Sequence, residues 1–307
     1  TLSGLYLSTG SRGWRLLNER SAYAVRFHPH DDAVLYAGFD NMLGKSTDRG
    51  ATWSYCAVGD RDNEHDITAI AIAPGTPQII FAGIGFCTGD RGEIIRIADN
   101  ETDFSTAACR PVLTTDVPVN TVVVHPDNAG VMLAGTGWFY APGTPGAVYM
   151  SSDGGLTWET GSLRNTVVNA IAIAASDPRV IYAACGESGS RYSGIYKSTD
   201  TGMSWERKIN GMPPEFSASD IMVDPSDDST VYVALYDALT EDQRTLGGVY
   251  ASFDGAGYWT QIGLSDYALH DINNISPDIT KTPRLRSGRG DSAQMFPAAD
   301  IIAGTES

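Results

Sequence analysis

The sequence predicts an all-β protein, a single β-propeller of six four-stranded blades that spans residues 1–307. Its 33 glycines and 15 prolines are spread between short runs rich in Val, Ile and Tyr, a pattern that indicates short strands joined by frequent turns. An apolar strand–turn–strand unit recurs at about the length of one blade, and an eight-residue turn recurs in register with it. A single all-β domain can reach this size.

The repeating unit consists of an apolar strand, a turn that usually contains Pro, and a second apolar strand that ends at Ala. The intervals between the end alanines are 45 to 52 residues, which fits one four-stranded blade each. Five copies are visible, and they end at Ala37, Ala82, Ala134, Ala183 and Ala234.

A sixth blade is predicted from pieces at both ends of the chain, about residues 1–20 and 291–307. Residues 293–297 and a strand ending at Ala303 would supply its first two strands, and residues 4–7 and 14–17 would supply the last two. Pairing the two ends would remove exposed strand edges. The Pro-, Ser- and Arg-rich residues 271–290 are surplus to this repeat and predict an insertion loop or lid.

The turn motif reads Ser-x-Asp-x-Gly-x-Thr/Ser-Trp. In such a turn the Asp accepts backbone N–H bonds across the tip, Gly takes a positive φ, and Trp packs beneath the hairpin. A catalytic Asp need not recur in each blade, so we interpret these aspartates as structural. Three copies and one degenerate copy occur, at Ser46–Trp53, Ser151–Trp158, Ser198–Trp205 and Ser252–Trp259.

These turns resemble those of the Asp-box, or bacterial neuraminidase repeat, propellers. That group includes sialidases, xyloglucan-cleaving endoglucanases, sortilin-type receptors and the photosystem II assembly factor. The resemblance covers the whole chain and implies the fold, whereas function must come from the loops. The chain lacks the Arg-Ile-Pro segment of sialidases, which argues against that activity. The xyloglucan enzymes usually pair two seven-bladed propellers around a cleft, and a lone six-bladed ring would lack the second wall.

Charge and composition restrict the partners. The net charge of −16 argues against nucleic acid, because phosphate binding needs clusters of Lys and Arg. No run approaches the ~18 apolar residues of a membrane helix.

The four cysteines are Cys56, Cys87, Cys109 and Cys185. They lack Cys-x-x-Cys spacing, which argues against a bound metal and leaves buried thiols or one disulfide among the first three. No cofactor is expected, with calcium at an acidic loop as the one exception considered.

Ligands are expected on the face opposite the Asp boxes. Six polar residues, one before each innermost strand, would ring the axial mouth. They would either hydrogen-bond a polar ligand or line a solvated channel mouth. These residues are Tyr23, Thr68, Asn120, Asn169, Ser219 and Asp291.

Loops on the same face carry further candidates. Residues 60–66 concentrate carboxylates, which suit calcium, general acid–base chemistry or simply a solvated turn. Aromatic side chains could stack on a sugar or a partner surface, or pack between loops. The candidate catalytic carboxylates are Asp62, Glu64, Asp66, Glu187, Asp237 and Glu241, and the candidate aromatic contacts are Trp138, Phe139, Tyr140 and Tyr236.

Three functions stay open on this basis. The leading hypothesis is a binding propeller that recognises a glycan or a protein through the loops of this face. The alternatives are a glycoside hydrolase or lyase that uses a pair of the carboxylates, and an assembly subunit of a larger complex. We expect an extracellular, periplasmic or surface-associated protein, and the first residue, Thr1, leaves room for a longer chain.

Overall fold

The computed structural model describes residues 4–8, 14–58, 65–75, 77–86, 91–99, 103–138, 146–186, 192–239 and 248–263, and the strands at 272–277, 284–287, 293–295 and 301–305. At residues 8, 14, 86, 236–239 and 263, and in the four strands after 263, it describes the backbone only. Apart from the short 3₁₀ helix η2 (Phe104–Thr106), the regular elements of these segments are strands. None of the described segments forms a helix that could cross a membrane.

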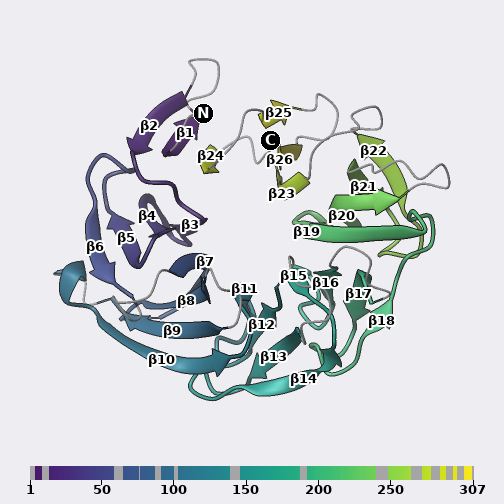
Figure 1. Cartoon of the computed structure of the whole chain (residues 1–307), viewed down its shortest axis with the longest axis horizontal. Helices are drawn as coiled ribbons and strands as arrows, with labels where there is room; N and C mark the ends of the chain where they lie inside the picture. The colour runs from purple at the N-terminus through teal and green to yellow at the C-terminus, as the bar shows by residue number, and fades with distance from the viewer. Residues whose placement is uncertain are drawn as a thin grey trace.

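Five antiparallel four-stranded sheets follow one another around a ring, each with its first strand innermost and its last outermost (Figure 1). Blade 1 comprises β3 (Ala24–His28), β4 (Asp31–Phe39), β5 (Met42–Ser46) and β6 (Ser54–Ala57). Blade 2 comprises β7 (His65–Ala73), β8 (Ile79–Phe86), β9 (Gly92–Ala98) and β10 (Ala108–Thr115). Blade 3 comprises β11 (Val119–Val124), β12 (Met132–Thr136), β13 (Ala147–Ser151) and β14 (Glu159–Arg164). Blade 4 comprises β15 (Val168–Ile173), β16 (Ile181–Cys185), β17 (Gly194–Ser198) and β18 (Glu206–Arg207). Blade 5 comprises β19 (Glu215–Asp224), β20 (Asp227–Leu239), β21 (Gly248–Ser252) and β22 (Thr260–Gly263).

The five blades coincide with the five predicted repeats, and the predicted all-β propeller is confirmed. The end alanines of the repeats lie in the second strand of each blade, and all five are fully buried. Each second strand packs against both neighbouring blades, because its side chains alternate between the two faces of the sheet. In β8, for example, Ile80 and Ile84 join the apolar cluster between blades 1 and 2, whereas Phe81 joins the cluster between blades 2 and 3.

Strands from both ends of the chain lie between blade 5 and blade 1 (Figure 1). β1 (Leu5–Ser8) pairs with β2 (Trp14–Asn18) on one side and with β24 (Arg284–Ser287) on the other. A second three-stranded sheet has the order β23 (Ile272–Pro277), β26 (Ile301–Thr305) and β25 (Ala293–Met295). The arrangement is consistent with six blades, although the described strands of this closing region do not form one four-stranded sheet.

The closing strands differ in detail from the prediction. β25 and β26 pair with each other, as expected of the first two strands of the closing blade. The strand ending at Ala303 was also expected beside the N-terminal strands, but β26 pairs with β23 instead. The partner of β1 comes instead from residues 271–290, the expected insertion loop, which contains both β23 and β24. An edge strand offers the same row of backbone groups to any strand, so sequence alone does not select its partner.

The Ser-x-Asp turn motifs of the sequence, for which we keep the label Asp box, form closed hydrogen-bonded turns. In the first box, Asp48 Oδ1 accepts from the Thr52 N–H at 2.8 Å, and Asp48 Oδ2 accepts from the Thr52 hydroxyl at 2.6 Å. Ser46 Oγ donates to Asp48 Oδ1 at 2.8 Å and accepts from the Gly50 N–H at 2.8 Å. Gly50 has φ 78°, and a Cβ there would meet the Leu17 side chain at 2.7 Å, so the position requires glycine. Asp153 and Asp200 repeat these contacts.

Candidate functional site

Four of the predicted mouth residues share one backbone feature. Thr68, Asn120, Asn169 and Ser219 each lie where the register between the first and second strands of a blade shifts by one residue. Each is thus the extra residue of a β-bulge, a device that turns a side chain out of its regular alternation.

The bulged side chains tie neighbouring blades together. The Asn120 amide donates to the Gly137 carbonyl in its own blade at 2.9 Å and to the Val168 carbonyl of blade 4 at 3.2 Å. Asn169 repeats this pattern, with bonds of 3.0 Å to the Gly186 carbonyl and 2.8 Å to the Ala218 carbonyl of blade 5. The hydroxyl of Thr68, which has one proton, lies within hydrogen-bonding distance of the Gly83 carbonyl in its own blade and the Val119 carbonyl of blade 3, and the Ser219 hydroxyl donates to the Ala234 carbonyl. These donors are engaged within the scaffold.

Tyr23 is placed differently, at the junction of blades 1 and 2. Its N–H donates to the Gly38 carbonyl at 3.0 Å, which fixes it just before β3, while its side chain is 43% exposed. Its hydroxyl hydrogen-bonds the carboxylate of Asp66, the second residue of β7. Asp40, which follows β4, forms an isolated β-bridge with Asp66. Tyr23, Asp40 and Asp66 therefore meet at the axial mouth, and we call them the mouth cluster.

Asn41 explains why the two aspartates meet. Asp40 and Asn41 form the two-residue connection between β4 and β5, in which Asn41 has φ 54°, a left-handed conformation that asparagine tolerates well. The Asn41 N–H donates to the His65 carbonyl at 3.2 Å, and its side-chain Oδ1 accepts from the His65 N–H at 3.1 Å. The hairpin tip of blade 1 is thereby fixed to the start of β7, which places Asp66 against Asp40.

The electrostatics of the mouth cluster centre on Asp66. Its pKa is raised, first because burial penalises the charged form and then because the negative charge of Asp40 is close. A hydrogen bond with the Asp40 side chain adds to the rise, while the Tyr23 hydroxyl and the charge of His65 oppose it. His65 itself is buried, with Nε2 2.8 Å from the Val58 carbonyl. The cluster combines an exposed aromatic ring with a carboxyl group whose pKa is raised.

Asp40 was missed by the sequence reasoning. Its signal was present, because Asp-Asn between two apolar strands is a typical hairpin turn. A second-to-third-strand connection lies on the same face as the loops that were considered. The predicted candidates came from longer loops, which carry more side chains than this two-residue turn.

The other predicted residues are only partly described. Trp138 follows β12 and is half-buried. Tyr236 and Asp237 belong to β20, where Asp237 pairs with Ser217 in the strand register, but their side chains are not described. No group of three or more potential metal ligands occurs within the described segments. The predicted residues that lie outside those segments are Asp62, Glu64, Phe139, Tyr140, Glu187, Glu241 and Asp291.

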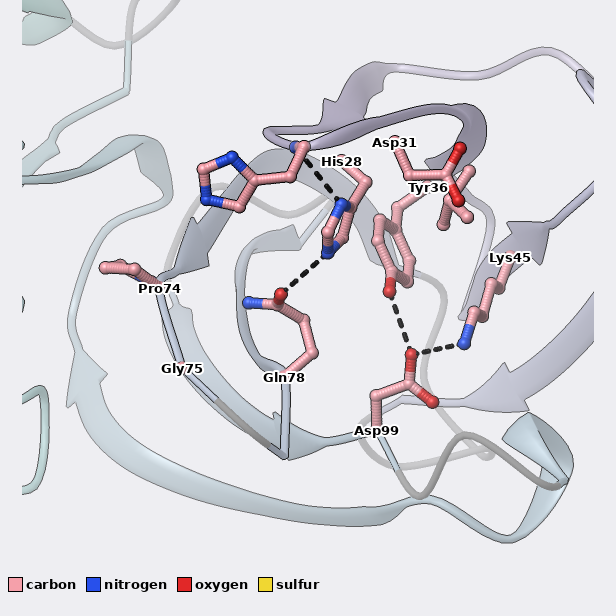
Figure 2. Close-up of a pocket in the computed structure, with 10 residues that line it drawn as sticks. His28, Asp31, Tyr36, Lys45, Pro74, Gly75, Gln78 and Asp99 are labelled. Atoms are coloured by element: carbon pink, nitrogen blue, oxygen red, sulfur yellow. Dashed lines mark hydrogen bonds and ion pairs between the residues drawn. The ribbon is translucent and has the colours of Figure 1, made fainter.

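A cavity of about 440 Å³ opens between blades 1 and 2 on the Asp-box face (Figure 2). Asp99 lies in its wall with 1% exposure, and accepts from the Tyr36 hydroxyl at 2.8 Å and from Lys45 Nζ at 2.5 Å. His28 Nε2 lies 2.9 Å from Gln78 Oε1. These polar groups hydrogen-bond one another across the junction of blades 1 and 2, which indicates a structural role.

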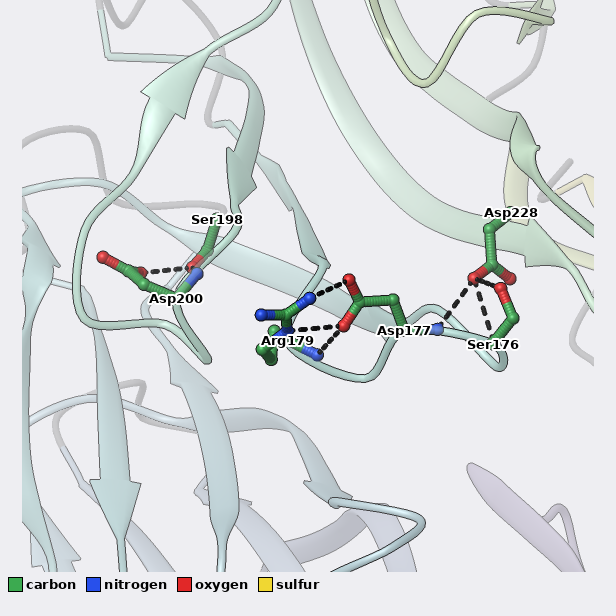
Figure 3. Close-up of polar contacts among 6 residues, drawn as sticks. All are labelled: Ser176, Asp177, Arg179, Ser198, Asp200 and Asp228. Carbon is green, nitrogen blue, oxygen red and sulfur yellow. Dashed lines mark hydrogen bonds and ion pairs between the residues drawn. The ribbon is translucent and has the colours of Figure 1, made fainter.

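Carboxylates elsewhere on the Asp-box face are also engaged, as Figure 3 shows for blades 4 and 5. Asp228 accepts backbone N–H bonds from Ala175, Ser176 and Asp177 at 2.9 to 3.1 Å, which joins blade 5 to blade 4. Asp177 in turn pairs with Arg179 at 2.8 Å. Asp228 and Asp177 are therefore engaged within the scaffold, and the mouth cluster on the opposite face remains the stronger candidate site.

Comparisons with known proteins bear on the fold. No family model matches the chain, and no curated protein matches it. The GH74 xyloglucanase from Xanthomonas campestris is similar in structure, with a TM-score of 0.67 and 15% identity over 91% of this chain and 46% of that one. A GH74 enzyme from Niastella koreensis gives a TM-score of 0.61 and 20% identity over 85% and 42%. The PQQ-bound aldose sugar dehydrogenase from Streptomyces coelicolor gives 0.53 and 13% over 92% and 93%.

At these identities the likeness shows the β-propeller fold alone. The chain spans less than half the length of the GH74 structures it matches.

Proposed function

We propose that this chain binds a neutral glycan at the axial mouth opposite the Asp boxes, with the mouth cluster as the centre of the site. The observation that carries the proposal is the exposed Tyr23 ring, whose hydroxyl is held by Asp66 beside Asp40. A sugar presents an apolar ring face and a rim of hydroxyl groups. An aromatic ring next to carboxyl groups meets both requirements.

The chemistry of the cluster supports a neutral ligand. The carboxylate oxygens of Asp40 and Asp66 can accept hydrogen bonds from sugar hydroxyls. A polyanion would be repelled by the two carboxylates and by the net charge of −16. The proposal includes an exported or surface-associated location, where such glycans are encountered.

Calorimetric titration with a panel of neutral polysaccharides, including xyloglucan, cellulose fragments and xylan, tests the proposal. For a polysaccharide that binds, Tyr23→Ala should weaken affinity by about tenfold or more, because it removes the stacking surface. Tyr23→Phe keeps the ring and should lose less. Tyr258→Ala is the matched control, because Tyr258 is 60% exposed in the Asp box of blade 5 and should not affect binding.

Two results contradict the proposal. One is binding that Tyr23→Ala and Tyr258→Ala affect equally. The other is a failure of every polysaccharide in the panel to bind, which would favour the protein partner that the sequence also left open.

Hydrolysis is the second candidate function, favoured by the raised pKa of Asp66, a property suited to a general acid. However, Asp40 and Asp66 are partners in a β-bridge and Asp40 raises the pKa of Asp66, which describes a coupled pair, whereas the two carboxyl groups of a glycosidase stand roughly 5 to 9.5 Å apart around the substrate. A hydrolase would therefore need its second carboxylate from another residue. Release of reducing ends that is abolished by Asp66→Asn, with binding retained, would establish hydrolysis.

A further inference from the structure

Two cysteines from different blades lie in contact at the outer rim. Cys56 belongs to β6, the outermost strand of blade 1, and Cys109 belongs to β10, the outermost strand of blade 2. Their Sγ atoms are 3.0 Å apart although 53 positions separate them in the chain. A disulfide has an S–S distance of about 2.05 Å, so a small movement would bring the sulfur atoms to bonding distance. We propose that Cys56 and Cys109 form a disulfide bond that joins blade 1 to blade 2.

The surroundings suit such a bond. Cys56 is 2% exposed and packs in the apolar cluster of the blade 1–blade 2 junction, while Cys109 is half-buried and gives an oxidant access. β6 and β10 belong to different sheets, so no backbone ladder links them. A disulfide would therefore supply a covalent connection where the two blades are otherwise held by side chains.

The pair is also chemically asymmetric. A hydrogen bond from Cys109 lowers the pKa of Cys56, whereas the same bond and burial raise the pKa of Cys109. One thiolate in such a pair is the nucleophile that disulfide exchange requires. Cys185 differs from both, because it lies fully buried in blade 4 and its pKa is raised by burial.

The oxidation balances with a small-molecule disulfide such as oxidised glutathione as the oxidant. One cysteine thiolate attacks a glutathione sulfur and expels the first glutathione thiolate, which leaves a mixed disulfide. The second cysteine thiolate then attacks the protein sulfur of that mixed disulfide and expels the second. Two cysteines are oxidised, one oxidised glutathione is reduced to two thiols, and the two cysteine protons end on those thiols.

Peptide mapping of the full chain tests the connection directly. After oxidation by glutathione disulfide, alkylation of free thiols and trypsin digestion, the four cysteines fall into four different peptides, 50–61, 62–91, 97–164 and 180–191. We expect peptides 50–61 and 97–164 to be linked, with a mass two hydrogens below their sum. Alkylation of both Cys56 and Cys109, or linkage of either one to peptide 62–91, would overturn the proposal.

Thermal unfolding gives an independent measurement. Closing a loop of this length should raise the Tm of the oxidised protein by roughly 5–10 °C over the dithiothreitol-reduced protein. Cys56→Ala/Cys109→Ala should abolish this difference, and Cys185→Ala should keep it. A difference that persists in the double variant contradicts the disulfide, even if the variant is less stable overall.

Discussion

At the scale of single residues, the same chemical group has opposite roles on the two faces of the ring. Hydrogen bonds from Thr52 and Ser46 hold the pKa of Asp48 at about 2, so this Asp-box carboxylate is fully charged and committed to its turn. Asp66, on the other face, has a raised pKa because it is partly buried beside Asp40. The aspartate with the raised pKa is the stronger candidate for ligand chemistry.

The raised pKa of Asp66 predicts a pH-dependent effect on stability. The folded state holds the Asp66 proton at pH values where the unfolded chain has already lost it. The carboxyl group therefore lowers stability as pH rises above its ordinary pKa of about 4. Asp66→Asn should raise the Tm at pH 7 and lose this advantage at pH 3. Calorimetric scans of both proteins across this range measure it, and a constant difference in Tm would contradict the assignment.

At the scale of elements, two blade junctions use the same Tyr–Lys pair but give it different partners in the next blade. Tyr36 and Lys45 are register partners in blade 1, and Tyr182 and Lys197 occupy the same positions in blade 4. Blade 2 has no Asp box and supplies Asp99 to the first pair. At the second junction the Lys197 ammonium donates to the Gly255 carbonyl at 2.8 Å, and the buried Tyr182 hydroxyl has no hydrogen-bond partner among the described residues.

Substitution of Asp99 should therefore strongly destabilise the junction of blades 1 and 2. Removing one partner of a buried ion pair leaves an uncompensated charge, so Asp99→Asn should lower the free energy of unfolding by about 3 kcal/mol. Asp32→Asn is the matched control, since its pair with Arg49 is about 60% exposed and should contribute less than ~1 kcal/mol. Urea unfolding followed by tryptophan fluorescence measures both. Equal losses would contradict a special role for the buried pair.

At the scale of the whole molecule, the sequence predicted the ring because its evidence is local and repeated. Period-two alternation and buried small residues define each blade, and both are visible in the order of the residues. The hydrogen bonds that Thr68 and Asn120 make to the next blade, and the contact between Asp40 and Asp66, depend on how adjacent blades dock. No local pattern encodes such docking, so the site was predicted only in part.

The structure and the repeat pattern assign different partner strands to β1 in the closing region. In the structure Leu7 lies opposite Leu285 of β24, whereas the repeat pattern placed the strand ending at Ala303 beside β1. Alternate amides of β1 point toward β24, and proline in β24 would leave them without their partner strand. Leu285→Pro should therefore accelerate hydrogen exchange of those β1 amides by about tenfold or more. Ile302→Pro, in β26, should leave them protected, and the reverse result would favour the closure that the repeat pattern predicted, in which the strand ending at Ala303 lies beside β1.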